Sequence, residues 1–317
     1  MPDPDPDPGS RHIVVAGASG LIGTALVADL EADGVRVTRL VRRPPRTPGE
    51  VQWLADARPL DPDVLIGADA VVGLNGASIG RMPWTPRYRS TLLWSRLAPT
   101  RTLAAAIRAL GADAPAFVSA SAVGVYGTAP GRALGEQAPA GDTFLARVCV
   151  QWEQAAQEAG PHARVALVRT APVVHAAGVL RPLIQLTRFG LAGPIGRGTQ
   201  AWPWISLRDE VRAIRHVIDQ GLSGPVNFAG PTRATANDLG FALAVRMNRP
   251  YLLRAPAWAL RLVLGRAAAD ALLLTDAHVV PAALAASGFT FAHPTVDDAV
   301  AAAVPDQARS ADSSSSD

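Results

Sequence analysis

The sequence contains no lysine. Its 317 residues include 30 Lys+Arg against 27 Asp+Glu, and each of these basic residues is arginine. The absence of lysine excludes a Schiff-base lysine, a phosphate-binding loop that depends on lysine, and a lysine general base. Because a guanidinium stays protonated, the cationic groups of this chain can bind anions but cannot exchange protons at neutral pH.

Cysteine is also scarce, since Cys149 is the only one. A single cysteine cannot form an internal disulfide or a cysteine metal site, and it fits a reducing compartment. The histidines show no metal-ligand spacing, so the sequence predicts no metal site. No run reaches the roughly 18 apolar residues of a membrane span, and residues 1–10 form an Asp-Pro repeat rather than a signal segment. We expect a cytoplasmic protein that does not associate with membranes.

Strong charge of one sign is missing as well. The net charge of +3 is small for 317 residues, and the arginines are scattered, so we do not expect nucleic-acid binding. A composition of 49% hydrophobic and 18% charged residues is that of an ordinary globular chain, long enough to bury a full core. The expected partner is a small-molecule substrate, and the expected assembly is a monomer or a homodimer.

Hydrophobic runs alternate with helical patterns over the first half of the chain. Strands are expected at residues 12–16, 35–41, 68–74, 116–120 and 164–170. Helices are expected at residues 21–31, 96–110 and 143–159. Buried strands that alternate with helices predict an α/β fold, with a Rossmann-type, doubly wound parallel sheet.

Beyond Pro172 the pattern loosens into Gly/Pro-rich loops. Helices at 209–220, 237–247 and 258–264 and a strand at 225–229 are expected there. We predict a Rossmann domain at 11–172, which later strands from about 200–230 rejoin, and a smaller substrate lobe at 173–304. The lobe includes a small C-terminal domain at about 249–300. The polar segments 1–10 and 305–317 are predicted to be disordered tails.

A glycine-rich turn directly follows the first expected strand and opens the first expected helix. Its sequence is Gly17-Ala18-Ser19-Gly20-Leu21-Ile22-Gly23. Glycines permit a tight turn and close approach of the backbone to a pyrophosphate, and the helix N-terminus presents unpaired N–H groups. This context favours dinucleotide binding over a merely structural turn. The predicted cofactor contacts are Gly17, Ser19, Gly20, Leu21, Ile22 and Gly23.

The end of the second expected strand distinguishes the two dinucleotides. An acidic residue there binds the ribose 2′-hydroxyl of NAD, whereas arginine suits the 2′-phosphate of NADP. The chain has Leu40-Val41-Arg42-Arg43 and no acid. We therefore predict that Arg42 and Arg43 bind NADP in preference to NAD; the alternative is two solvated arginines at a strand end.

Several motifs resemble the extended short-chain dehydrogenase/reductase superfamily. They are the GxxGxxG spacing of Gly17 to Gly23, and Ser119-Ala120-Ser121-Ala122 ahead of Val125-Tyr126-Gly127. Further stretches resemble the bacterial epimerase-family proteins that carry a small C-terminal domain of unknown function. These stretches are Trp84-Thr85, Ser95-Arg96 and Thr100, Cys149 with Trp152-Glu153, Gly193 to Gly196, Trp204-Ile205-Ser206, Arg254 to Trp258, Val280-Pro281 and Gly288-Phe289. The resemblance covers residues 12 to 304.

The resemblance implies an NADP-binding Rossmann domain and a C-terminal lobe that forms the substrate pocket. It gives Ser121 the role of the active-site serine, whose hydroxyl contacts the substrate oxygen beside the nicotinamide. Leu74, Asn75 and Gly76 correspond to a loop that contacts the cofactor. Arg169 and Thr170 correspond to the strand and turn that cover the nicotinamide.

The acid/base pair of the superfamily, Tyr-x-x-x-Lys, is absent. By its spacing from Cys149, the motif falls on Thr143 to Arg147, where threonine replaces tyrosine and arginine replaces lysine. Arg147 can still bind the cofactor ribose, but an aliphatic hydroxyl does not ionise near neutral pH. The substitute candidate is Tyr126, with a packed loop tyrosine as the equal alternative.

Five other side chains are weaker candidates. Glu153 is either an acid that faces the site or a solvated helix carboxylate, and Cys149 is more often a buried apolar residue than a nucleophile. His175 is either near the nicotinamide or structural. The paired tryptophans Trp202 and Trp204 either stack on a substrate ring or, more often, cover the core.

The sequence as a whole favours an NADP-binding oxidoreductase or epimerase-like enzyme. Its substrate is expected to be a small polar carbonyl or hydroxyl compound, with a nucleotide sugar as one candidate, and hydride is expected to pass between nicotinamide C4 and a carbon held against Ser121. The alternative is a non-catalytic NADP-binding regulatory or redox-sensing protein, which the missing Tyr-Lys pair favours.

Overall fold

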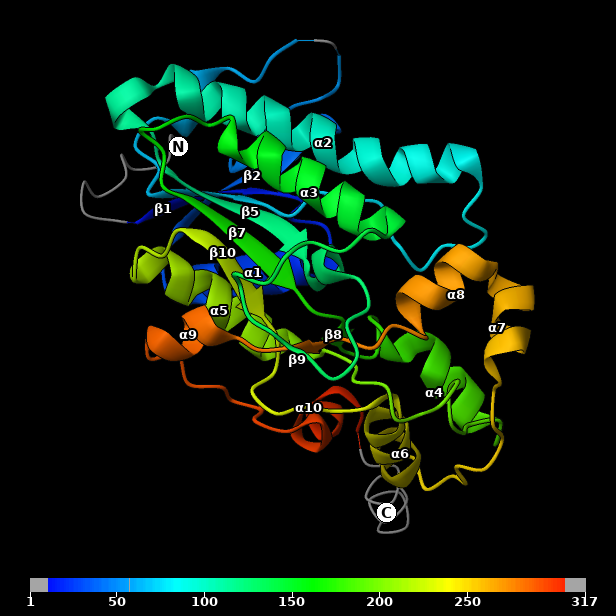
Figure 1. Cartoon of the computed structure of the whole chain (residues 1–317). Helices are drawn as coiled ribbons and strands as arrows, with labels where there is room; N and C mark the ends of the chain where they lie inside the picture. The colour runs from blue at the N-terminus through cyan, green and yellow to red at the C-terminus, as the bar shows by residue number, and fades with distance from the viewer. Residues whose placement is uncertain (1–10, 57, 306–317) are drawn as a thin grey trace.

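A seven-stranded parallel sheet organises the molecule (Figure 1). The computed structural model describes residues 11–56 and 58–305, so the predicted tails lie outside the described residues apart from Pro305. The strand order is β10-β7-β5-β4-β1-β2-β3. The strands are β1 (His12–Ala16), β2 (Arg36–Val41), β3 (Glu50–Gln52), β4 (Ala70–Gly73), β5 (Ala116–Ala122), β7 (Val165–Thr170) and β10 (Gly224–Phe228). The predicted α/β fold with a doubly wound parallel sheet is confirmed.

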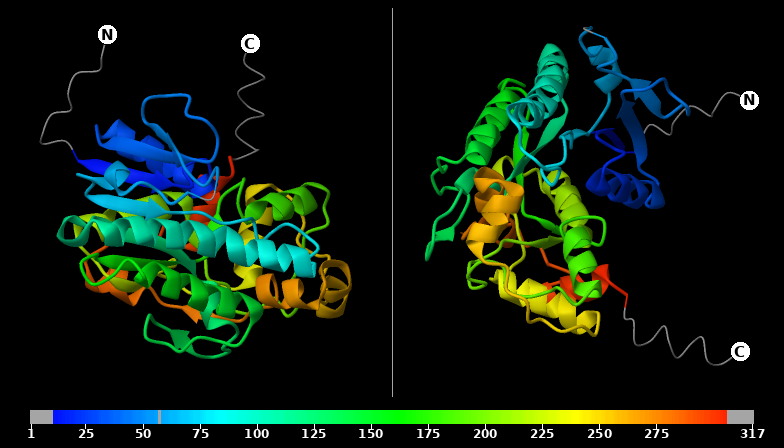
Figure 2. Two further views of the ribbon diagram at one scale, coloured as in Figure 1. Left: turned by 90° about the horizontal axis from the view of Figure 1, so that it is seen from above. Right: turned by 90° about the vertical axis from the view of Figure 1, so that its right-hand side faces the viewer.

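Helices cover both faces of this sheet (Figures 1 and 2). On one face lie α1 (Leu21–Ala32) and α5 (Leu207–Asp219), and on the other lie α2 (Pro86–Ala109) and α3 (Phe144–Gln157). Every residue of β1 and β4 is buried. Continuous apolar strands are what a sheet that is covered on both faces requires.

The rest of the chain forms a lobe at the carboxyl ends of the strands. Its helices are α4 (Leu180–Arg188), α6 (Ala236–Arg246), α7 (Ala257–Leu264), α8 (Arg266–Leu272), α9 (Ala282–Ala286) and α10 (Val296–Ala303). Two small sheets pair β8 (Val173–Val174) with β9 (Ile205–Ser206) and β6 (Ala133–Leu134) with β11 (His278–Val279). Trp202 and Trp204 are buried in the apolar core of the lobe, in agreement with their interpretation as core residues.

Contacts between the lobe and the Rossmann sheet determine where a cleft can lie. Ala268 of α8 packs against Trp84 and Leu92, at the beginning of α2. On the other side of the carboxyl edge of the sheet, a Cβ at Gly178 would lie 3.3 Å from the side chain of Leu21, the first residue of α1. The lobe therefore reaches both sides of the crevice at the carboxyl edge of the sheet, which is where ligands bind in doubly wound folds.

Helix α2 begins ten residues earlier than the predicted residue 96. The hydroxyl of Thr85 accepts a hydrogen bond from the N–H of Tyr88, and Pro86 occupies the first helical position. Both features are strong signals for a helix start. The prediction instead placed the start at residue 96, where the apolar periodicity begins. The short elements β3, α4, α8, α9 and α10 were not predicted, because their apolar patterns are too short to show a period.

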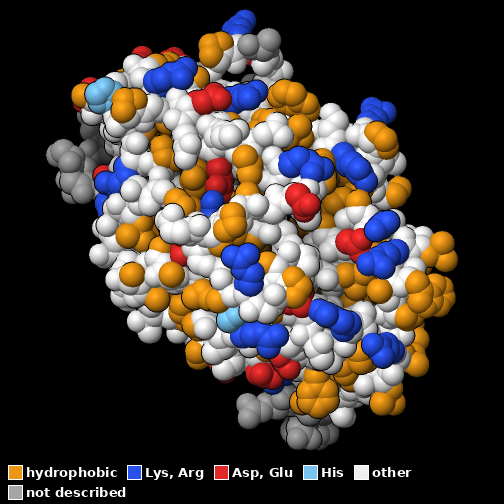
Figure 3. All heavy atoms as spheres, viewed as in Figure 1, with side chains coloured by type: hydrophobic (Ala, Val, Ile, Leu, Met, Phe, Trp, Pro, Cys, Tyr) orange, Lys and Arg blue, Asp and Glu red, His pale blue; other side chains and the backbone are white. Residues whose placement is uncertain are grey.

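Hydrophobic side chains gather at the edge of the lobe, where α7 lies (Figure 3). Trp258, Leu262 and Val263 on this helix are 70%, 79% and 79% exposed. Elsewhere on the face shown in Figure 3, basic and acidic side chains are interspersed. No helix in the described part of the chain combines the length and the apolar character of a membrane span.

Candidate functional site

The glycine turn between β1 and α1 brings three backbone segments into contact. Gly17 has a φ of 87°, and a Cβ there would lie 2.8 Å from the carbonyl carbon of Leu74. A Cβ at Gly23 would lie 2.3 Å from the carbonyl oxygen of Gly17. Neither position has room for a side chain, so the turn needs glycine at both.

The N-terminus of α1 is free to bind an anion. Its N-cap residue, Gly20, provides no side-chain cap, and the first turn carries no acidic residue. Gly20 and Ser19 are exposed. The first N–H groups of the helix, including those of Leu21 and Ile22, therefore lack side-chain acceptors and lie at the positive end of the helix dipole. This arrangement suits a pyrophosphate.

The two arginines at the end of β2 have different environments. Arg43 binds Glu50 through two hydrogen bonds of 2.7 and 2.6 Å and thereby links β2 to the end of the sheet. The hydrogen bonds from Arg43 and, after them, the one from the backbone N–H of Arg46 lower the pKa of Glu50 to about 2. Arg42 is exposed and has no polar partner among the described residues. Of the two predicted phosphate ligands, Arg42 is the one whose guanidinium remains available.

The loop after β4 forms the other wall of the crevice. The N–H of Leu74 donates to Ala16 of β1 at 2.8 Å, and this bond holds the loop beside the glycine turn. The Oδ1 of Asn75 is buried and has no hydrogen-bond partner within the described chain. A buried acceptor without a donor is rare, and a ligand group that donates to it would complete it. The glycine cradle, the uncapped helix and this orphaned oxygen together fit a dinucleotide.

Ser121 belongs to a buried network beneath the crevice. Its hydroxyl donates to Oε1 of Glu153 at 2.6 Å, and Arg169 donates to both oxygens of Glu153 at 2.8 Å each. The parallel register places Ser121 directly beside Arg169. Glu153 is therefore neither a solvated helix carboxylate nor an unpaired acid, since it balances the charge of Arg169.

Tyr126 is part of the same network. Its hydroxyl donates to Oδ1 of Asn227 at 2.7 Å and accepts from Arg169 at 2.8 Å. Burial raises the pKa of Tyr126, and only 3% of the residue is exposed. Of the two interpretations of Tyr126, this arrangement favours the packed tyrosine that joins β7 to β10.

The structure does not bring Arg147 to this network. Arg147 is exposed, and its guanidinium donates to the carbonyl oxygen of Asp142 near the start of the same helix. Because it is two residues from the buried Cys149, it points to roughly the opposite side of α3. Thr143 is the N-cap residue of α3, and its hydroxyl accepts from the N–H of Ala146. The proposed placement of Tyr-x-x-x-Lys on residues 143–147 therefore does not direct a basic residue toward Ser121.

Two buried ionisable groups lie at the carboxyl ends of β5 and β7. Burial raises the pKa of the Cys149 thiol to about 12, which matches the expectation of a buried, unreactive cysteine. Burial also raises the pKa of Glu210 to about 8. Glu210 accepts a hydrogen bond of 2.7 Å from Thr170, while its Oε2 has no partner in the described chain. The sequence analysis missed Glu210, because an acidic residue in the first turn of a helix is common.

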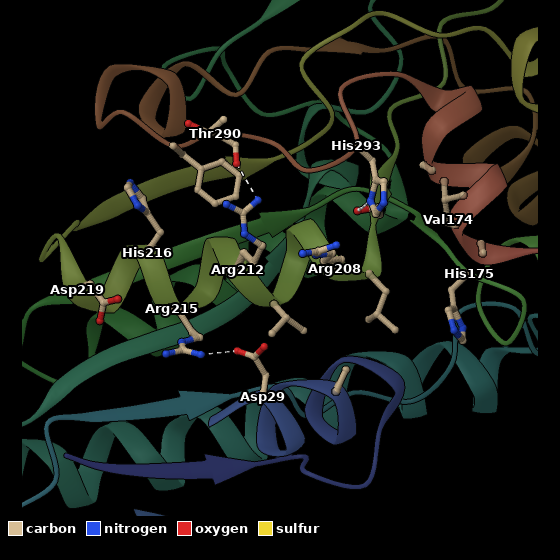
Figure 4. Close-up of a pocket in the computed structure, with 18 of the residues that line it drawn as sticks. Asp29, Val174, His175, Arg208, Arg212, Arg215, His216, Asp219, Thr290 and His293 are labelled. Carbon is tan, nitrogen blue, oxygen red and sulfur yellow. Dashed lines mark hydrogen bonds and ion pairs between the residues drawn. The ribbon is translucent and has the colours of Figure 1, made fainter. Parts of the chain in front are cut away.

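His175 lies in a different hollow from the glycine turn. A groove of about 910 Å³ runs between α1, α5 and α10, and His175 contributes to its wall (Figure 4). Arg215 of this groove pairs with Asp29 at 2.6 Å. The Nδ1 of His175 accepts from the N–H of Ala177, a local loop contact. Among the described residues, no group of three or more His, Cys, Asp or Glu side chains can hold a metal ion.

Two family models together match most of the described residues. Residues 13–229 match the model of the NAD dependent epimerase/dehydratase family. Residues 255–303 match a separate domain of unknown function, DUF1731. The first match covers the sheet and the crevice, and the second covers helices α7 to α10.

Similar proteins occur in distant organisms. The epimerase family protein ML0860 of Mycobacterium leprae is 41% identical over 293 residues, which cover 91% of this chain and 94% of that protein. The crystal structure of human epimerase family protein SDR39U1, solved with NADPH, is 29% identical and has a TM-score of 0.83. That alignment covers 92% of this chain and 99% of the human one.

A solved nucleoside-diphosphate sugar epimerase from Corynebacterium glutamicum has a TM-score of 0.72 and 29% identity. It aligns with 98% of this chain, which corresponds to 62% of the other protein. The family matches agree with the crevice geometry, in which the turn, the helix terminus and the loop after β4 fit a dinucleotide. The chain belongs to the NAD dependent epimerase/dehydratase family, as an NAD(P)-binding, SDR39U1-like member with a C-terminal DUF1731 region.

Proposed function

We propose that the chain is an NADP(H)-dependent oxidoreductase or epimerase-like enzyme for a small polar carbonyl or hydroxyl compound. The observation that carries this proposal is the uncapped N-terminus of α1 beside the unpaired Arg42. The first binds a pyrophosphate, and the second offers a bidentate cation to a 2′-phosphate. The human relative was solved with NADPH, and this supports the same cofactor here.

The residues of the chain have separate tasks in this proposal. The α1 terminus and Asn75 hold the cofactor, which supplies a hydride donor or acceptor when it is bound. Arg169 and Glu153 fix the end of β5 and orient the hydroxyl of Ser121 through a hydrogen bond of 2.6 Å. The lobe covers the carboxyl edge of the sheet and limits the access of water.

A non-catalytic NADP-binding regulator is the second candidate. It is favoured because the hydroxyls of Ser121 and Tyr126 both donate to buried side chains and are committed to the network beneath the crevice. Hydrogen bonds of this kind stabilise a fold whether or not a reaction occurs.

A cofactor-oxidation screen separates the two candidates. Wild type, Ser121→Ala and Gly23→Ala are tested with NADPH against small aldehydes, ketones and nucleotide sugars, with thermal shift as a second readout. The enzyme proposal predicts NADPH consumption by wild type, much slower consumption by Ser121→Ala, and no consumption by Gly23→Ala, because the clash at Gly23 should prevent cofactor binding. The contrary outcome is that NADPH stabilises wild type while, with every compound tested, wild type oxidises NADPH no faster than Ser121→Ala does. In that case the regulator is the better description.

A further inference from the structure

Arg96 is fixed in the seam between α2 and the loop after β4. Its guanidinium donates to the carbonyl oxygens of Leu92 at 2.8 Å and Ala77 at 3.2 Å. A Cβ at Gly76 would lie 3.2 Å from the guanidinium carbon, so glycine lets the cation lie against the loop backbone. The ring of Trp152 lies 5.2 Å from the same carbon. These contacts hold the guanidinium of Arg96, and with it the positive charge, in one position.

The charge of Arg96 has no counter-charge in the described chain. Its two hydrogen bonds go to neutral carbonyl groups, whereas the nearby Arg169 has the carboxylate of Glu153. The surrounding stretch, residues 70–112, contains six arginines and no acidic residue. Burial lowers the pKa of Arg96, because the loss of water around the guanidinium disfavours its charged form. A partly buried cation without a carboxylate costs stability, and its presence favours a role in binding.

Arg96 lies on the side of the crevice opposite Arg42. The sheet order β2-β1-β4-β5 places Arg42 at one end, the glycine turn in the middle and Gly76 beyond it. Arg96 also acts electrostatically on Cys149, whose thiol lies near the backbone of Ala122 at the end of β5. A dinucleotide that binds across the crevice with its 2′-phosphate at Arg42 has its nicotinamide half over β4 and β5.

We propose that Arg96 makes this crevice bind NADPH more tightly than NADP⁺. The nicotinamide ring is neutral in the reduced cofactor and carries a positive charge in the oxidised one. A fixed cation on the nicotinamide side repels the oxidised ring and leaves the reduced ring unaffected. This inference rests on the proposed NADP binding. It also assigns a direction to the proposed reaction, because a protein that binds NADPH in preference to NADP⁺ favours reduction of its substrate.

Isothermal titration with NADPH and with NADP⁺ tests the proposal without any substrate. The variants are Arg96→Gln, which removes the charge, Arg96→Lys, which keeps it, and Arg101→Gln as the control. Arg101 lies on the same helix, is half exposed and pairs with Glu158 at 3.7 Å. In wild type and in Arg101→Gln, NADPH is expected to bind about tenfold more tightly than NADP⁺. Arg96→Gln is expected to lose most of this ratio, and Arg96→Lys to retain it.

Adenosine 2′,5′-bisphosphate is the probe for the other half of the site. Its affinity is expected to be the same in wild type and in Arg96→Gln, because it has no nicotinamide. Equal affinities of wild type for NADPH and NADP⁺, or an unchanged ratio in Arg96→Gln, would overturn the proposal. If wild type binds the bisphosphate but neither dinucleotide form preferentially, only this inference fails. If wild type binds none of the three, the proposed function fails too.

Discussion

Arg169 connects parts of the protein that lie far apart in the sequence. It binds Glu153 on α3, the hydroxyl of Tyr126 and the carbonyl oxygen of Glu136. The sequence identified Ser121 and Tyr126 as candidates near the end of β5, and the structure does bring both into one network. Their hydrogen-bond partners could not be predicted, because they depend on the register between β5 and β7.

Glu210 gives a test at the scale of one residue. Its folded-state pKa of about 8 lies above the ordinary value of 4.5, so the folded protein binds more protons than the unfolded chain between these values. Its contribution is therefore complete below pH 4.5, and the free energy of unfolding should fall as the pH rises toward 8. Glu210→Gln keeps an acceptor for Thr170 and should remove this slope, with a gain on the order of 5 kcal/mol above pH 8.

Urea unfolding at pH 5, 7 and 9 measures this effect. The control is Glu158→Gln, which removes an exposed carboxylate and should preserve the slope that Glu210 causes. A Glu210→Gln protein with the same slope as wild type would show that Glu210 is ionised in the native state at neutral pH.

At the scale of elements, the first strand, the glycine turn and the first helix were predicted almost to the residue. The signal is strong because glycine is required twice there, once for a positive φ and once for a 2.3 Å approach. Helix α3 was also predicted, but the side it presents to the sheet was not. The Tyr-Lys spacing suggested Arg147, whereas burial selects Cys149 and Glu153. Because Thr143 and Arg147 replace both residues of the Tyr-Lys motif, the spacing of the motif does not indicate which side of the helix faces the sheet.

Two glycine variants test the turn as an anion-binding element. Gly20 has a φ of −78°, and a Cβ there would lie 3.4 Å from the nearest oxygen, an ordinary contact. Gly20→Ala should therefore fold with a stability within about 1 kcal/mol of wild type, and its added methyl should weaken NADPH binding by obstructing the approach of the pyrophosphate.

Gly23→Ala is the contrasting variant, because its Cβ would clash with the carbonyl oxygen of Gly17. Gly23→Ala should both lower the melting temperature and abolish NADPH binding. Thermal unfolding measures the first effect and titration with NADPH the second, on the same samples of both variants. Unchanged NADPH affinity in a folded Gly20→Ala protein would mean that the α1 terminus does not contact the cofactor.

At the scale of the whole molecule, the candidate cofactor site at the carboxyl edge of the sheet has chemically distinct ends. Arg42 marks the outer end, and Arg96 lies beyond the glycine turn on the other side. The sequence predicted the first, because a strand end after a glycine turn has a known meaning. It could not predict the second, because Arg96 reaches the crevice through a contact with Gly76, 20 residues earlier on another element. In a chain without lysine, both tasks belong to arginine.

Cofactor preference is the central claim, and the most direct measurement compares the dissociation constants of NADPH and NADH. The proteins are wild type, Arg42→Asp and Arg36→Asp, whose arginine is exposed at the opposite end of the same strand. Wild type and Arg36→Asp should prefer NADPH. Arg42→Asp should weaken NADPH by about 100-fold and change NADH by less than about threefold, since only NADPH carries the 2′-phosphate. Equal losses for both cofactors, or a wild type that prefers NADH, would contradict the account.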